Sequence, residues 1–147
     1  MALIEVPELP FDCWRNWKKR PRPSLDIDVP LQFGILGLYV LADSSKDLSD
    51  GPALNLENLP EEIFYIGMST NVDSRLEQAH RAVQRYLNSE NAHIGNLWFT
   101  TWRSEWSNSN LKQSRGIIAK TTLLLYERAI ILAYAKQYGR LPKANRE

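Results

Sequence analysis

The most restrictive feature of the sequence is a ten-residue segment, residues 33–42, whose side chains are apolar on both faces of a strand. Such a strand must be covered on both sides, as in the centre of a sheet. A second strand is predicted at residues 63–67, after a connection rich in Asp, Ser, Asn, Gly and Pro at residues 43–61. Because this connection carries no helix signal, we expect the two strands to be antiparallel.

Two helices and a third strand are predicted farther along the chain. One helical face is formed by residues at spacings of 4, 3, 4 and 3, namely Val72, Leu76, Ala79, Val83 and Tyr86. We expect one helix here, capped by Thr70 or Asn71 and ended at residues 88–91. Residues 97–102 predict a strand, and residues 118–138 predict a long apolar helix that stops at Gly139. The expected fold class is α+β, a small three-stranded antiparallel sheet flanked by helices.

The N-terminal part differs from the rest of the chain in its prolines and its charge. Five of the eight prolines lie in residues 1–32, which predicts an irregular arm with a short turn of helix near residues 11–19, followed by a domain at residues 33–147. The arm carries five basic residues, Arg15, Lys18, Lys19, Arg20 and Arg22. These residues either contact DNA phosphates or are merely solvated while Trp14 and Trp17 anchor the arm to the domain.

Composition and charge exclude several classes of protein. The single cysteine, Cys13, excludes an internal disulfide framework and a cysteine-based zinc site. No apolar run approaches the roughly 20 residues of a membrane helix, and the first residues lack the pattern of a secretory signal, so we expect an intracellular, cytoplasmic protein without a membrane partner. Residues 11–23 and 103–147 carry net charges of +4 and +6, against −5 for residues 43–62. Such segregation is compatible with a polyanionic partner.

One carboxylate in the long helix is out of place. Between Trp106 and Arg146 there are eight basic residues and a single acid, Glu127. The residues three and four positions away on either side are all apolar: Leu123, Leu124, Ile130 and Ile131. An ionised carboxylate on an apolar face is costly unless it is paired or holds a metal. Glu127 is therefore either half of a buried ion pair or a metal ligand.

The motifs of both strands and the residues after them resemble the GIY-YIG nuclease family. The first strand contains Gly37-Leu38-Tyr39 and the second contains Tyr65-Ile66-Gly67. Four further positions match in order, a functional arginine, a metal-binding glutamate and a closing Pro-x-x-Asn: Arg75, Glu127, Pro142 and Asn145. The resemblance covers roughly residues 34–146 and leaves the N-terminal arm out.

The resemblance implies a DNA endonuclease that hydrolyses phosphodiester bonds with one Mg²⁺ or Mn²⁺ ion. In that scheme Glu127 holds the metal, Tyr39 is the candidate general base and Arg75 stabilises the phosphoryl transition state. Tyr65 orients the attacking water or the phosphate, and Asn145 has a supporting role. Tyr39 as a base requires nearby positive charge, because the pKa of a free tyrosine is about 10.

Two positions depart from the family pattern. Met68 stands where many members have a basic residue, and Ala79 stands where many have a histidine. His80 follows one residue later, and five helical steps would turn its side chain roughly 140° from Arg75. His80 is therefore kept as a weaker site candidate, with a surface histidine as the alternative.

Three functional hypotheses stay open on the sequence. The first is a single-domain endonuclease that either recognises a DNA structure or cuts DNA without specificity. The second is a sequence-specific restriction endonuclease, for which a homodimer is a candidate assembly because no second DNA-reading domain is evident. The third is a nucleic-acid-binding module on the same scaffold without useful catalysis. The set of Tyr39, Arg75 and Glu127 favours an enzyme, whereas Met68 and the displaced His80 favour the binding module.

Overall fold

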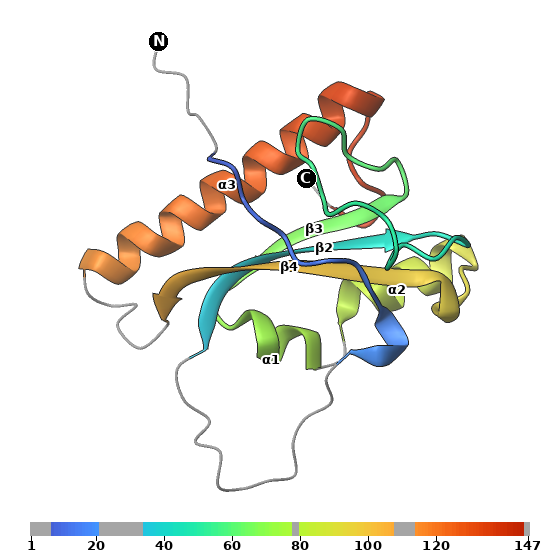
Figure 1. Cartoon of the computed structure of the whole chain (residues 1–147), viewed down its shortest axis with the longest axis horizontal. Coiled ribbons are helices and arrows are strands. Elements are labelled where there is room, and N and C mark those ends of the chain that lie inside the picture. Colours follow the sequence, from blue (N-terminus) through green and yellow to red (C-terminus); the bar gives the residue numbers. More distant parts are fainter. Residues whose placement is uncertain (1–6, 21–33, 78–79, 108–113, 146–147) are drawn as a thin grey trace, which may run out of the picture.

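The computed structural model describes residues 7–20, 34–77, 80–107 and 114–145, and it has an α+β fold (Figure 1). Four antiparallel strands form one sheet in the order β1-β4-β2-β3. Their bounds are Arg15–Asn16 for β1, Ile35–Asp43 for β2, Ile63–Ser69 for β3 and Leu97–Ser107 for β4. β2 lies between β4 and β3, as the two apolar faces of its sequence predicted.

Helices cover both faces of the sheet (Figure 1). The long helix α3, Ser114–Tyr138, crosses one face, and two short helices, α1 (Val72–Glu77) and α2 (Arg81–Glu90), lie on the other. Two 3-10 turns complete the structure, η1 at Trp17–Lys19 and η2 at Ile94–Asn96. In the described parts of the chain, no helix combines the length and the hydropathy needed to cross a membrane.

The prediction of a three-stranded sheet was wrong, because the N-terminal arm contributes a fourth strand. Arg15 and Asn16 of β1 pair with Phe99 and Trp98 of β4. Just before β1, the N–H of Asp12 donates to the carbonyl of Thr101 at 2.9 Å. This short pairing uses backbone groups of β4, which would be an edge strand without β1. Backbone pairing does not depend on an alternating side-chain pattern, so the arm needs none to form it.

The prediction of one helix after the second strand was also wrong. α1 ends at Glu77, and His80 has an extended backbone with φ −110° and ψ 118° as the N-cap of α2. Both short helices bury their apolar side chains in the same core, with Val72 from α1 and Val83 from α2. A shared buried face explains why the apolar spacing resembles that of one continuous helix. Ala79, which the prediction also used, lies outside the described residues.

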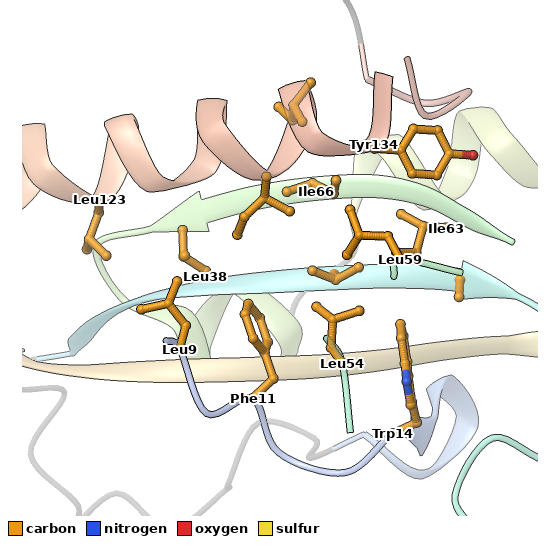
Figure 2. Close-up of a cluster of buried hydrophobic side chains, with 14 of the residues drawn as sticks. Leu9, Phe11, Trp14, Leu38, Leu54, Leu59, Ile63, Ile66, Leu123 and Tyr134 are labelled. Atoms are coloured by element: carbon orange, nitrogen blue, oxygen red, sulfur yellow. The ribbon is translucent and has the colours of Figure 1, made fainter. Parts of the chain in front are cut away.

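The sheet separates two hydrophobic cores. We name the first the α3-side core, which combines α3 with the arm, the loop after β2 and one face of β2 (Figure 2). Its members include Leu9, Phe11, Trp14, Leu36, Leu38, Val40, Leu54, Leu59, Leu123, Ile130 and Tyr134. We name the second the α1/α2-side core, which includes Trp17, Tyr39, Leu41, Val72, Leu76, Val83, Tyr86 and Phe99.

Candidate active site

Tyr39 lies in the middle of β2, opposite Gly67 of β3 and Thr101 of β4. Its side chain is on the α1/α2 side and is 1% exposed. A Cβ atom added at Gly67 would lie 2.7 Å from Cζ and 2.8 Å from the hydroxyl oxygen of Tyr39, closer than real Cβ contacts. Gly67 therefore leaves the space across β3 that the Tyr39 ring occupies.

The Tyr39 hydroxyl is joined to His80 by a buried hydrogen bond of 2.8 Å to Nε2. Nδ1 of the same imidazole accepts the backbone N–H of Ala82 at 3.1 Å. A backbone N–H can only donate, so Nδ1 carries a lone pair and the proton of the neutral ring is on Nε2. Nε2–H therefore donates to the oxygen of Tyr39.

This arrangement corrects two expectations about His80. The side chain is 2% exposed, so it is not a surface histidine. It also shares a partner with Arg75, because both side chains hydrogen-bond the Tyr39 hydroxyl, so it does not point away from that residue. Both expectations assumed a continuous helix. The backbone of His80 is instead extended, and its imidazole contacts Tyr39 on the α1/α2 side of the sheet.

Arg75 and Tyr65 complete the cluster around Tyr39. The Tyr65 ring centroid lies 5.7 Å from that of Tyr39 and 5.2 Å from that of His80. Burial is the largest influence on the pKa of Tyr39 and raises it above the ordinary value. Tyr65 adds to this rise in pKa, whereas the charge and the hydrogen bond of Arg75 oppose it. The general-base role was expected to need a lowered pKa, but burial outweighs Arg75 and the pKa of Tyr39 is raised. Tyr39 is therefore a neutral phenol at pH 7, and Arg75 only partly offsets the cost of ionising it.

The environment of His80 keeps its imidazole neutral. Burial, followed by the charges of Arg75 and Arg85, lowers the pKa of His80 to about 4. Protonation would also place a hydrogen on Nδ1, where the N–H of Ala82 needs an acceptor. At physiological pH, His80 is therefore a fixed donor to Tyr39 and does not take its proton.

Glu127 lies on α3, across the sheet from this cluster, and is half-buried. The ion pairs found among the described residues do not include it. Burial raises the pKa of the Glu127 carboxyl, while the charge of Arg128 and a hydrogen bond with the Met68 backbone oppose the rise. The alternative of a buried ion pair for Glu127 therefore finds no partner among the described residues.

Glu127 and Asn145 both reach the free edge of β3. The Asn145 amide accepts from the N–H of Ile66 and donates to its carbonyl, both at 2.9 Å. Backbone groups two residues apart on a strand point in the same direction, so the N–H of Met68, which interacts with Glu127, also faces this edge. Asn145 thus supports β3 directly beside the position of Glu127.

The predicted site residues therefore form two groups. One cluster on the α1/α2 side contains four of them: Tyr39, Tyr65, Arg75 and His80. Glu127 and Asn145 lie at the edge of β3. The two groups contact neighbouring residues of β3. Tyr39 lies opposite Gly67, and Glu127 interacts with the backbone of Met68, the next residue.

The predicted DNA-binding residues of the arm differ in their surroundings. The guanidinium of Arg15 lies 5.0 Å from the ring centroid of Phe99, and that of Arg20 lies 4.4 Å from that of Trp17. Lys18 and Lys19 are exposed. Arg22 lies outside the described residues. The tryptophans of the arm are buried, so the arm is anchored to the domain and presents its two lysines to solvent.

Sequence reasoning missed two residues of this site. Gly67 was noted as part of a motif, but its steric role depends on how the Tyr39 ring crosses the neighbouring strand. Trp17 was assigned to the arm, yet its ring contacts His80 with centroids 6.5 Å apart. The burial of Trp17 could be suspected from its size and apolar surface, but no local signal names its partner.

Comparisons with known proteins do not identify relatives of the chain: no protein-family model, no curated protein and no solved structure matches it.

Proposed function

We propose that the protein is a metal-dependent DNA endonuclease of the GIY-YIG type that hydrolyses phosphodiester bonds. The observation that carries the proposal is the environment of the Tyr39 oxygen. It receives Nε2–H of His80 at 2.8 Å and a hydrogen bond from Arg75, while the carboxylate of Glu127, which has no ion pair among the described residues, lies at the adjoining stretch of β3. Two donors on one buried phenol are hard to explain by strand packing alone.

In the proposed mechanism Tyr39 is the general base that activates the attacking water. Its burial disfavours the phenolate, and the donors from His80 and Arg75 favour it. Tyr65, which is half-exposed beside Tyr39, orients the water or the phosphate. Arg75 then serves a second purpose, because its guanidinium can stabilise the negative charge that develops on the phosphoryl oxygens.

A single Mg²⁺ or Mn²⁺ ion belongs to the proposal, and Glu127 is the residue that would hold it. The carboxylate is partly desolvated and forms no ion pair within the described part of the chain, which suits a hard cation. The described residues contain no cluster of three or more His, Cys, Asp or Glu side chains, but Mg²⁺ keeps several of its waters and needs only one or two carboxylates. When bound, the ion would neutralise charge on the phosphoryl group and the leaving oxygen.

DNA is the proposed substrate, and the exposed Lys18 and Lys19 are the proposed contacts to its phosphates. Both follow Trp17, which is in contact with His80, so phosphates bound by the lysines would pass near the Tyr39 cluster. The proposal keeps the cytoplasmic location expected from the sequence.

A second candidate is a sequence-specific restriction endonuclease that acts as a homodimer. A specific observation favours it: exposed apolar residues on α3 repeat every seven positions, at Ile118, Leu125 and Leu132. If two α3 helices pair antiparallel about Leu125, Ile118 of one copy meets Leu132 of the other, and Arg128 meets Thr122 instead of a second arginine. The sedimentation mass of the wild type and of Leu125→Glu tests this pairing, and a monomeric wild type would exclude it.

Cleavage of supercoiled plasmid DNA tests the main proposal. The wild type should nick or linearise the plasmid with Mg²⁺ or Mn²⁺ and should stop when EDTA is added. Tyr39→Phe removes one hydroxyl without changing the packing of the ring, so it is the matched control against a contaminating nuclease. DNA binding without any metal-dependent cleavage would instead support the third reading, a binding module.

A further inference from the structure

The arm anchors two tryptophans on opposite sides of the sheet. Trp14 is 3% exposed and lies in the α3-side core with Phe11 and Leu54 (Figure 2). Trp17 is 2% exposed and lies in the α1/α2-side core. The two residues are the same amino acid, three positions apart and equally buried, but only Trp17 borders the candidate site.

Trp17 meets the edge of the site through two aromatic contacts. Its ring lies edge-on to His80, with centroids 6.5 Å apart and planes at 81°, and edge-on to Phe99 at 6.0 Å and 87°. Edge-to-face pairs of this kind have a preferred geometry, so they fix ring orientation as well as burying area. The contact with Phe99 secures Trp17 to β4, independently of α1 and α2.

The backbone around Trp17 is held in place by polar contacts. Asn16 caps η1 by accepting the N–H of Lys18 at 3.0 Å, and its amide donates to the carbonyl of Gly95 at 3.0 Å. The N–H of Arg20 donates to the carbonyl of Trp17 at 3.2 Å, and its guanidinium covers the Trp17 ring. These contacts fix the segment around Trp17 against the domain.

We propose that Trp17 is a positioning residue for His80: it fixes the imidazole and excludes water from it, so that Nε2–H stays directed at the oxygen of Tyr39. His80 needs such support because it is an N-cap with an extended backbone, not a residue inside a helix. The catalytic consequence rests on the proposed nuclease function, whereas the effect on the imidazole does not.

Trp17 is a neighbour of His80 that carries no titratable group. Among the described residues, the titratable or charged groups that contact the imidazole or act on its charge are Tyr39 from β2, Tyr65 from β3, Arg75 from α1 and Arg85 from α2. The two arginines act on its charge directly. Trp17 acts through the exclusion of water, which is the largest influence lowering the pKa of His80. Opening this side to solvent would therefore stabilise the imidazolium.

Histidine NMR tests the proposal without any assay of cleavage. The chain has two histidines, His80 and the exposed His93, so His93→Gln assigns their ring signals. In Trp17→Leu, the pKa of His80 should rise by about one unit as water enters, and the Nε2–H signal should broaden. Trp17→Phe keeps an aromatic edge and should recover most of the wild-type titration.

Trp14→Leu is the matched control, because it removes an equally buried indole from the same segment on the other face of the sheet. It should lower stability and leave the titration of His80 unchanged. An equal shift in Trp14→Leu, or no shift in Trp17→Leu, would overturn the proposal. If Trp17→Leu does not fold, the wild type decides: a nuclear Overhauser effect between the Trp17 and His80 rings is required, and its absence rejects the contact.

Cleavage assays give the second arm of the test. If the nuclease function holds, Trp17→Leu should reduce the cleavage rate at saturating DNA about tenfold, as expected when a donor to the base is misaligned, with little change in DNA affinity. A wild type with no nuclease activity but with the predicted histidine shifts would reject the proposed function and leave the positioning role of Trp17 intact.

Discussion

The two faces of β2 are both buried, yet they are built from different chemistry. Toward α3, the strand presents Leu36, Leu38 and Val40 to a layer of apolar side chains. Toward α1 and α2, it presents Tyr39, whose hydroxyl is hydrogen-bonded to a neutral histidine in the interior. Burial on the first face stabilises the fold, whereas burial on the second shifts pKa values and orients polar groups. β2 thus presents an apolar face to α3 and the Tyr39–His80 pair to α1 and α2, while the proposed metal ligand Glu127 lies on α3.

The largest expected effect comes from Glu127→Gln, which should move activity and stability in opposite directions. Loss of the carboxylate should reduce cleavage by about three orders of magnitude, because metal binding supplies several kcal/mol to the reaction. Burial raises the pKa of Glu127 in the folded protein, so the ionised form destabilises the metal-free fold at pH 7. Thermal unfolding of metal-free Glu127→Gln should therefore occur at a higher temperature than that of the wild type. Full cleavage by this variant would remove Glu127 from the mechanism.

Arg75→Ala should have the next largest effect. If the guanidinium stabilises charge that grows in the transition state, the cleavage rate should fall by about two to three orders of magnitude while DNA affinity changes little. Arg75→Lys should recover little of the rate, because a single ammonium does not reproduce the forked donor. Rate and affinity are measured separately, by single-turnover cleavage and by titration without metal. Equal losses in both would assign Arg75 to DNA binding alone.

The comparison of the two faces is tested most directly by Leu38→Ala and Tyr39→Phe, which alter neighbouring residues of β2. Leu38→Ala should cost about 2–5 kcal/mol of unfolding free energy by opening a cavity, with an unchanged dependence of cleavage on pH. Tyr39→Phe leaves the buried Nε2–H of His80 without its acceptor, so it should cost about 1–3 kcal/mol of unfolding free energy, and it should reduce cleavage about a hundredfold.

The pH dependence separates these two variants further. Because the pKa of Tyr39 is raised, the fraction of ionised base below that pKa grows about tenfold per pH unit, so the wild-type cleavage rate should rise from pH 7 to pH 9. Tyr39→Phe should lose this rise, and Leu38→Ala should keep it. A rise that persists in Tyr39→Phe would show that another group is the base.

His80 should make the α1/α2 side sensitive to acid. Its pKa is about 4 when folded and about 6.5 when unfolded, so between these values the unfolded chain binds more protons. Stability should therefore fall as the pH falls from 6.5 to 4, by about 3 kcal/mol from this group. His80→Asn keeps a capping side chain without the titration, so its denaturant unfolding should lose less free energy over this range than the wild type. Parallel curves would contradict the assignment.

The smallest expected effect concerns the arm. Lys18→Ala with Lys19→Ala should weaken DNA binding and reduce the slope of log affinity against log salt by roughly one unit per lost phosphate contact. Because both side chains are exposed, the stability and the His80 titration should not change. Deletion of the whole arm would be a poorer experiment, since it also removes Trp17 and β1. An unchanged salt slope would show that these lysines do not contact DNA.

Local sequence patterns determined a large part of the fold and of the candidate site. The central position of β2, its antiparallel pairing with β3 and the long helix α3 were confirmed. Each depends on side-chain spacing within one segment, which is where periodicity carries information. Residues within the confirmed strands, such as Tyr39 and Tyr65, could therefore be placed on adjacent strands in advance, whereas the register that puts both on one face came from the structure.

Tertiary structure alone decided the fourth strand, the orientation of His80 and the burial of Trp17 beside it. β1 forms through backbone pairing with β4, about eighty positions away, which leaves no trace in its side chains. His80 points at Tyr39 because its backbone is extended between two short helices, although the apolar spacing there fits one helix. Local spacing records which face of an element is buried. Which distant side chain contacts that buried face is decided only in the folded protein, because the contact depends on how all the intervening elements pack.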